Sequence, residues 1–454
     1  MSNLKEKIDN EKSRSGKLAV LISLVQLALP AIVQQLLSSI LQYVDTAMVG
    51  HLGEAATATV STSTTPNWLI HSLPWGFTIA ILSLTSQAYG RGDKEEMKKL
   101  AAMGCRVVLF FGLILTAICL LISPLLPGWM QAAPEIREEA SAYFFIVSLS
   151  LAFFVANSVF ASSMQAIKDT RTPMIVNVSA NVLNVFLNWL MIYRFGMGTR
   201  GAAWATAVST AFGGTVMFLT FRRKPELRFP LREIFKGSED LFRRVLVIAI
   251  PVMATNIVSC MGYVVFAGMV SGMGVTIFAA HSIALTAEEI FYLPGYGIRT
   301  ATSALIGIAI GEKNRQKFND VRNVSLWLTT LLMVFNGVML YLVSNPLMRL
   351  FTNSEDVVVL GAKLLRIVAF CEPFFGIMVV WEGIYYGTGR TRVVFIIESL
   401  SMWGIRILGT WLVIRAGYGV IEVWYCMIAD NIMKALGLTI YGLRHPDIAN
   451  FRPD

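Results

Sequence analysis

Long apolar stretches separated by short polar segments make up most of the sequence. Twelve of them lie near residues 18–49, 57–88, 101–124, 140–165, 174–195, 201–221, 244–271, 276–310, 324–344, 358–386, 393–414 and 418–442. A helix needs about 20 apolar residues to cross roughly 30 Å of hydrocarbon. The pattern therefore predicts an all-α polytopic membrane protein with twelve transmembrane helices.

The composition agrees with a lipid environment. Of the 454 residues 55% are hydrophobic and only 15% are charged, whereas about 25% is usual in soluble domains. The first apolar stretch has no small-residue cleavage pattern, so we interpret it as the first spanning helix and not as a signal peptide. Although the net charge is +9, the basic residues are spread over many short loops, which does not favour a nucleic-acid partner.

Lysine and arginine predict the orientation. Alternate loops and the two tails hold 27 of the 38 basic residues, and short cytoplasmic loops of membrane proteins carry such an excess. This alternation requires an even number of spans with both termini in the cytoplasm. We expect a multi-pass protein of the plasma membrane, most simply a bacterial inner membrane.

Proline, glycine and Thr-Arg positions recur along the chain at a single offset of 221 residues. The pairs are Pro30 and Pro251, Gly53 and Gly274, Gly76 and Gly297, Gly90 and Gly311, and Thr170-Arg171 and Thr391-Arg392. Five matches at one offset predict two six-helix bundles related as parallel repeats, with a central cleft between them.

The expected segments follow from this repeat. They are a cytoplasmic N-terminal tail (1–17), an N-terminal lobe (18–221), a cytoplasmic basic linker (222–243), a C-terminal lobe (244–442) and a cytoplasmic C-terminal tail (443–454). We interpret the linker as a solvated loop held by its positive charge, with a specific lipid or partner site as the less favoured alternative.

Two helices of the N-terminal lobe carry polar stripes. The side chains fall three or four residues apart and so share one helix face: Gln34, Ser38, Gln42 and Asp45 on the first helix, and Asn177, Asn181, Asn184 and Asn188 on the fifth. Polar groups at membrane depth are costly and usually face a cavity or one another. The stripes predict a polar lining of the cleft around Asp45, and hydrogen bonding between helices is the alternative.

The C-terminal lobe has a different charge pattern. Its apolar stretches contain several acids, of which Glu288 and Glu372 are the candidates for a second ion-binding site because neither has a basic residue one turn away. Arg299 and Arg406 are possible partners of the other acids. Asp45 corresponds at the offset to Phe266, so we expect the function to be asymmetric between the lobes.

Mechanical and chemical features complete the pattern. Pro30 and Pro251 lie inside predicted spans, where a proline frees a backbone carbonyl and permits a kink. The four histidines show no metal-ligand spacing, and no nucleotide-binding loop or nucleophile elbow is present. The sequence predicts a transporter that uses an ion gradient, with no enzymatic activity, metal or organic cofactor.

These residues together resemble the multidrug and toxic compound extrusion family. The resemblance covers essentially the whole chain and is carried by stretches such as LALPAIVQQLLSSILQYVDTAMVGHLG, SQAYGRGD, QAIKDTRTP, AAHSIALTAEEIFYLPGYG and PFFGIMVVWEGIYYGTGRTR. It implies antiport, in which Na⁺ or H⁺ influx drives export of cationic or amphiphilic organic compounds, by a functional monomer within the lipid bilayer. An alternative within the same superfamily is a flippase or exporter of a lipid-linked or other bulky metabolite.

The resemblance also assigns site residues, with departures. An acid on the first helix matches Asp45, and the family's kink proline matches Pro30. The family's fifth-helix Asn and Asp match Asn184 and Asn188, so the second acid is missing here. Another branch's seventh- and tenth-helix acids would fall near Ser259 and Phe375 and are also missing, while Glu288 matches an acid before the Pro-Gly of the eighth helix. The coupling ion therefore stays open between Na⁺ and H⁺.

Overall fold

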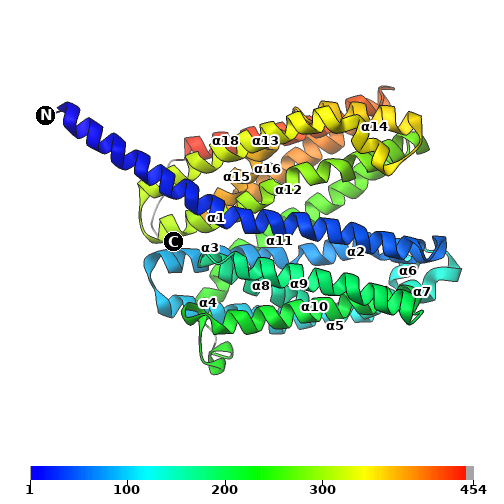
Figure 1. The fold of residues 1–454 in the computed structure, drawn as a ribbon, viewed down its shortest axis with the longest axis horizontal. Coiled ribbons are helices and arrows are strands. Elements are labelled where there is room, and N and C mark those ends of the chain that lie inside the picture. Colours follow the sequence, from blue (N-terminus) through cyan, green and yellow to red (C-terminus); the bar gives the residue numbers. More distant parts are fainter. Residues whose placement is uncertain (1, 237, 446–454) are drawn as a thin grey trace. The chain divides into compact units, whose positions relative to one another are not determined.

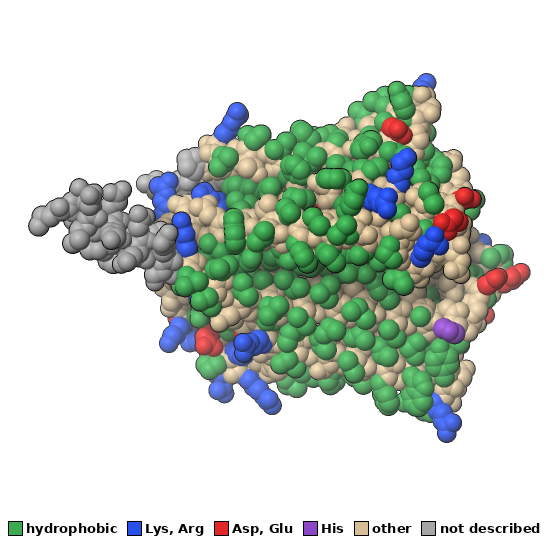
Figure 2. Space-filling model, turned by 45° about the horizontal axis from the view of Figure 1, so that its top comes forward, with side chains coloured by type: hydrophobic (Ala, Val, Ile, Leu, Met, Phe, Trp, Pro, Cys, Tyr) green, Lys and Arg blue, Asp and Glu red, His purple; other side chains and the backbone are tan. Residues whose placement is uncertain are grey.

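The computed structural model describes residues 2–236 and 238–445, with side chains from residue 16 onward. This part of the chain forms successive helical segments joined by short turns (Figure 1), and Figure 2 shows hydrophobic side chains over much of one face of the molecule. Within it, nine segments are long and apolar enough to span a membrane as single helices, and a tenth is a pair bent by 55°, α14 (Glu355–Val368) and α15 (Glu372–Thr388). Two further long helices, α12 (Val275–Gly311) with 37 residues and α18 (Val420–Arg444) with 25, bring the long helical segments of the described chain to twelve. Both carry charged side chains in their interiors.

The chain divides into two compact units. The N-terminal unit comprises Val33–Met253, and the C-terminal unit comprises the residues up to Ile32 and those from Ala254 onward. Besides part of α1 (Ser2–Gly50), the N-terminal unit contains α2 (Glu54–Ser72), α3 (Pro74–Arg91), α4 (Lys94–Val107), α5 (Leu113–Ile122), α6 (Leu126–Trp129), α7 (Arg137–Ser148), α8 (Leu151–Ala166), α9 (Arg171–Asn188) and α10 (Gly198–Arg223).

The C-terminal unit takes most of its helices from the second half of the chain. Helix α11 (Glu239–Ser271) leads into α12, α13 (Arg315–Phe351), α14, α15, α16 (Thr391–Ser401), α17 (Leu408–Arg415) and α18. Helices α12, α13 and α15 pack against one another. Buried side chains of α12, α14 and α18 form a large apolar core that includes Leu364 and Trp424.

Both dividing points lie inside helices, just after the two repeated prolines. Helix α1 passes from one unit to the other two residues after Pro30, and α11 does so two residues after Pro251. Ile32 and Met253, the last residues before each division, differ by 221. The beginning of each predicted lobe thus packs with the other unit. The central cleft and the lobe boundaries of the sequence analysis stay predictions.

The backbone repeats at the same offset. Four pairs of residues with positive φ are related by 221 positions: Gly53 and Gly274, Gly92 and Lys313, Lys168 and Gly389, and Gly196 and Gly417. Helices α4 and α13 begin alike, because the side chains of Asp93 and Asn314 accept hydrogen bonds from backbone N–H groups three residues later. The repeat is therefore one of local structure as well as of sequence.

Two repeated glycines allow close helix packing. A Cβ on Gly76 of α3 would lie 2.5 Å from the carbonyl oxygen of Ala249 in α11, and one on Gly297 of α12 would lie 2.5 Å from a side-chain atom of Ile32 in α1. Each glycine thus packs against the part of a proline-containing helix that comes from the other half of the sequence. This explains why both positions are glycine.

The basic linker is folded and not a free solvated loop. Helix α10 extends to Arg223, two short 3₁₀ turns follow, η4 (Pro225–Leu227) and η5 (Leu231–Ile234), and α11 begins at Glu239. Both turns pack on α4. Leu227, Phe229 and Ile234 are buried there, so the interpretation as a solvated loop was wrong for this apolar part of the linker.

Candidate functional site

Two side-chain pairs join α1 to α9 in the N-terminal unit. Asn181 donates to the hydroxyl oxygen of Ser38 over 2.8 Å, and Asn188 donates to Oδ1 of Asp45. Seven residues separate the members on each helix, which is two turns, so both pairs lie along one contact line. The predicted polar faces of these two helices meet each other.

The Asp45 carboxylate is held by the amide group of Asn188 and forms no ion pair with a described residue. Asp45 is half-buried, whereas Asn188 is fully buried. The Asn188 side chain also donates to Oδ1 of Asn184 over 3.3 Å, so both of its N–H groups are used. Its own Oδ1 is buried and accepts no hydrogen bond from any described residue. An unsatisfied amide oxygen therefore belongs to the residue that binds the only acid of the stripe.

The asparagines of α9 also reach the neighbouring helices. Asn184 donates to Thr206 of α10 over 3.4 Å, and Asn157 of α8 donates to Asn177 over 2.7 Å. The predicted alternative, hydrogen bonding between helices, thus applies to much of this stripe. Two members of the first-helix stripe differ: the side chains of Gln34, half-buried, and Gln42, exposed, bond to no other described residue.

Local structure fixes the position of this site. A π-helical turn, η3 (Trp189–Arg194), follows Asn188 directly, and Tyr193 in it donates to the backbone oxygen of Met48 on α1. Such turns widen a helix and are frequent at functional sites. Beside Asp45 lies a buried apolar cluster that includes Val49 and Tyr143. Asp45 therefore lies between the asparagine side chains of α9 and a buried apolar cluster.

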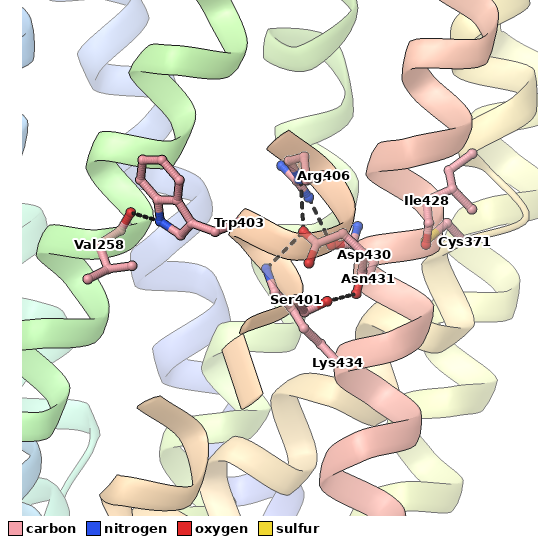
Figure 3. A network of polar contacts seen from close by, with 9 residues as sticks. All are labelled: Val258, Cys371, Ser401, Trp403, Arg406, Ile428, Asp430, Asn431 and Lys434. Atoms are coloured by element: carbon pink, nitrogen blue, oxygen red, sulfur yellow. Dashed lines mark hydrogen bonds and ion pairs between the residues drawn. The ribbon is translucent and has the colours of Figure 1, made fainter. Parts of the chain in front are cut away.

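The C-terminal unit contains a buried ion network instead (Figure 3). The Asp430 carboxylate of α18 pairs with Nε of Arg406 at 2.8 Å and with Nζ of Lys434 at 2.9 Å. Arg406 also donates to Oδ1 of Asn431 over 3.1 Å, and Ser401 donates to the backbone oxygen of Asp430. Side-chain exposure is 5% for Arg406, 0% for Asp430 and 6% for Lys434, so one buried carboxylate is shared by two buried cations.

A second π-helical turn, η6 (Met402–Ile407), carries Arg406. The guanidinium lies 5.3 Å from the ring centre of Tyr263 and 5.7 Å from that of Phe266, both on α11. The indole of Trp403 donates to the backbone oxygen of Val258, also on α11 (Figure 3). Each unit thus has a π-helical turn beside its polar network, at positions that do not correspond in the repeat.

The two predicted C-lobe acids lie near this network. Glu288 of α12 and Glu372 at the start of α15 are buried and close enough to interact electrostatically, and Arg406 acts on Glu288 in the same way. Oε2 of Glu372 has no hydrogen-bond partner among the described residues. Glu288 and Glu372 are therefore both buried in the C-terminal unit, where they influence each other electrostatically.

A further ion pair joins Arg299, named in the sequence analysis as a possible partner of an acid, to Glu382, which that analysis missed. Arg299 of α12 donates to Glu382 of α15 over 2.6 Å, with side-chain exposure of 14% and 5%. Glu398 of α16 shares a side-chain hydrogen bond with Glu382. Lys434 was also missed. It follows Asp430 by four residues, the spacing of a helical ion pair, so the sequence alone could have predicted this pair.

The two networks have different chemical capacities. Asp45 forms no ion pair with any described residue, and its neighbours are neutral oxygen and N–H groups. One carboxylate with amide oxygens suits a proton or a small monovalent cation. Asp430, in contrast, already has two cationic partners at its Oδ2, although its buried Oδ1 has no hydrogen-bond partner among the described residues.

Comparison with known proteins gives consistent results. The family model described as MatE matches residues 30–190 and again residues 251–412, two stretches that begin 221 residues apart. A "Probable multidrug resistance protein NorM" of Thermotoga maritima is 29% identical over 419 residues, covering 91% of this chain and 90% of the relative. "Probable multidrug resistance protein YpnP" of Bacillus subtilis is 25% identical and covers 85% and 87%.

Solved structures show the same fold. A MATE transporter of Vibrio cholerae superposes with a TM-score of 0.90 at 18% identity, covering 96% of this chain and 100% of the other. An outward-facing multidrug resistance MATE family transporter of the MOP superfamily gives 0.88 at 20% identity, covering 95% and 96%. The predicted twelve-helix fold is confirmed. With the repeated family match over most of its length, the chain belongs to the multidrug and toxic compound extrusion (MATE) family.

Proposed function

We propose that this protein is a secondary active multidrug exporter. Na⁺ or H⁺ influx would drive export of cationic or amphiphilic organic compounds by alternating access, with Asp45 as the ion-binding residue. The carrying observation is the hydrogen bond between Asn188 and Asp45, beside a buried amide oxygen that has no partner among the described residues. The names of the NorM and YpnP relatives support the substrate class.

The residues around Asp45 support a specific ion-binding step. An ionised Asp45 accepts the N–H of Asn188, as the structure has it. A protonated Asp45 becomes a donor, and Oδ1 of Asn188 is an acceptor on the same side chain that has no partner among the described residues. A Na⁺ ion would instead be held by the Asp45 carboxylate and by amide oxygens such as those of Asn184 and Asn188. In either case binding replaces one set of contacts between α1 and α9 by another.

Helix α1 supplies a route from this step to a conformational change. Asp45 lies 15 residues beyond Pro30 on the same helix, about 22 Å along its axis. Just after Pro30 the helix passes from one compact unit into the other. Changed contacts at Asp45 would therefore favour a different bend at Pro30. Pro251 in α11 would be the corresponding bending point.

The proposal also covers the orientation of the protein in the membrane, the residues along the substrate path and an alternative ion site. The protein would act as a monomer in the plasma membrane, with both termini in the cytoplasm and Gln34, Ser38, Gln42, Asn177 and Asn181 lining the substrate path. Glu288 and Glu372 are the alternative ion site, which their burial and mutual proximity support.

Efflux from proteoliposomes tests the proposal. A fluorescent organic cation is loaded, a Na⁺ gradient or a pH gradient is applied separately, and wild type is compared with Asp45→Asn and with Glu288→Gln. We expect wild type to export the dye under one of the gradients. Asp45→Asn should lose this gradient-driven efflux, because an amide neither binds a proton nor neutralises Na⁺, while Glu288→Gln should retain it.

Each of the other possible efflux results would reject a different part of the proposal. Normal gradient-driven efflux by Asp45→Asn would reject Asp45 as the ion-binding residue. A loss confined to Glu288→Gln would transfer the role to the C-terminal unit. If wild type exports no cationic or amphiphilic dye under either gradient, the multidrug antiport itself is wrong.

A further inference from the structure

The linker between α10 and α11 forms a small folded element, here called the linker cap (residues 224–236). It packs on α4 through the buried side chains of Leu227, Phe229 and Ile234. In Figure 1 it extends sideways from the end of α4, across the direction of the helices and not along it. Because α10 ends and α11 begins here, the linker cap lies where two spanning helices leave the membrane.

Three basic residues fix its shape from inside. Arg106 of α4 donates to the backbone oxygens of Ile234 at 2.8 Å and Lys236 at 2.9 Å. Arg222 donates to the backbone oxygen of Phe229 over 2.6 Å and lies 4.8 Å from its ring centre. Lys224 pairs with Asp169 at 2.6 Å.

The Asp169 pair remains charged at neutral pH. Partial burial acts to raise the pKa of Asp169, but hydrogen bonds from Lys224 and Thr172 outweigh it and hold that pKa below its usual value. The linker cap is thus clamped at its start by an ion pair and at its end by Arg106. Its outward face is therefore a defined surface.

Large apolar side chains lie on that outward face. Phe235 is 77% exposed and Leu231 is 56% exposed, whereas Ile234 of the same segment is buried. Phe242, on the first turn of α11, is 42% exposed. Exposed aromatic and aliphatic side chains next to a membrane are typical of segments that lie in the bilayer interface.

The charge around these side chains is positive. Eight basic and four acidic residues lie between Arg222 and Arg244. The exposed Arg223, Arg228, Arg232 and Arg243 form no ion pair with any described residue. Their charge is complementary to phosphate headgroups, and arginine binds phosphate through a planar fork of donors.

We propose that the linker cap is a docking surface for anionic phospholipid headgroups. Leu231, Phe235 and Phe242 would insert into the interface of the adjacent leaflet, and the free arginines, Arg228 and Arg232 in particular, would bind lipid phosphates. A lipid surface fits better than a protein partner, because the surface projects sideways at the point where the spanning helices end. Docking would hold the linker cap against the membrane while α11 bends at Pro251.

Depth measurement with a spin label tests this inference. Phe235→Cys is labelled in the full-length protein and compared with Glu226→Cys, an exposed polar position of the same linker cap. Of the five native cysteines, four are buried and Cys426 is partly buried, so wild type treated with the label gives the background. The proteins are reconstituted in phosphatidylcholine alone and in phosphatidylcholine mixed with phosphatidylglycerol, and accessibility to oxygen and to a water-soluble nickel chelate is recorded.

We expect the label at 235, but not at 226, to be reached by oxygen and shielded from the chelate in the anionic bilayer. Replacing both arginines, Arg228→Ser and Arg232→Ser, should lower the docking equilibrium constant roughly fivefold per arginine, and high salt should lower it as well. Elution of each variant as a single folded species in detergent excludes misfolding as the cause of a loss.

Three results would overturn the inference. Equal chelate access at 235 and 226 in both bilayers would show that the linker cap does not dock. Equal protection at 235 in both bilayers and in the arginine variant would remove the role of anionic lipid. Dipolar broadening between labels at 235 would identify a second copy of the chain as the occupant.

Discussion

The two units share their backbone plan but differ in how they treat charge. At corresponding places in the repeat the N-terminal unit has Asp45 and the C-terminal unit has Phe266. Asp45 is bound by the neutral amide of Asn188, whereas the ring of Phe266 lies under the guanidinium of Arg406, whose charge is balanced by Asp430. The repeat therefore conserves turns and packing while the polar chemistry has diverged.

This difference separates two roles for buried charge. A carboxylate with amide neighbours changes its charge state or binds a cation without losing an ion pair. A carboxylate between two buried cations cannot, because removing its charge leaves both without compensation. We interpret the Asp430 network as structural and the Asp45 site as the one able to respond to an ion.

The largest expected effect is on stability in the C-terminal unit. Asp430→Leu leaves Arg406 and Lys434 buried without their shared carboxylate, and such a loss costs about 3–5 kcal/mol. Asp45→Asn removes no ion pair with a described residue and should change stability much less. The difference is measured by thermal unfolding of both variants in the same detergent. Unfolding is monitored as loss of the monodisperse species.

A compensated variant serves as the control for Asp430→Leu. Adding Arg406→Met and Lys434→Met removes all three charges of the network together, which should recover part of the lost stability because neither cation is left buried without the Asp430 carboxylate. If Asp45→Asn destabilises the protein as much as Asp430→Leu does, the division into a structural and a responsive network is wrong.

Much of the N-terminal site could be predicted from helical spacing. Ser38 and Asp45 are seven residues apart, as are Asn181 and Asn188, and the structure joins them in two pairs. Spacing along one helix gives the face on which a side chain lies. It does not give the partner, so the sequence left open whether the stripes line a cavity or bond to each other.

The C-terminal network was less accessible from the sequence. Arg299 and Glu382 are 83 residues apart, and only the packing of α12 against α15 brings them together. Arg406 is directed by a π-helical turn, which a period of 3.6 residues does not predict. The Asp430 and Lys434 pair was within reach, because it follows the four-residue spacing of a single helix.

A medium effect is expected at the repeated glycines, where the two units are alike. Gly76→Ala and Gly297→Ala each place a Cβ within 2.5 Å of an atom of a facing helix, and overpacking of this kind costs about 1–3 kcal/mol. Both should lower the unfolding temperature to a similar extent. Gly268→Ala in α11 is the control, because a Cβ there meets nothing within 4 Å and alanine favours a helix.

The two glycine variants also test whether the two units are alike in their helix packing. Destabilisation by only one of them, with Gly268→Ala neutral, would show that the repeat extends to the turns but not to the close packing of the proline-containing helices.

The smallest effect on stability, and the sharpest on function, is expected within the α1 and α9 contact line. Asn181→Ala and Asn188→Ala each remove one side-chain hydrogen bond between these helices, worth about 1 kcal/mol in a membrane. Only Asn188 touches Asp45, so only Asn188→Ala should shift the pH or Na⁺ dependence of dye efflux, while Asn181→Ala keeps the wild-type dependence. Efflux rates at a series of pH values and Na⁺ concentrations provide the measurement. An equal shift in both variants would mean that the whole stripe responds to the ion as one hydrated surface, and that Asp45 is not the specific site.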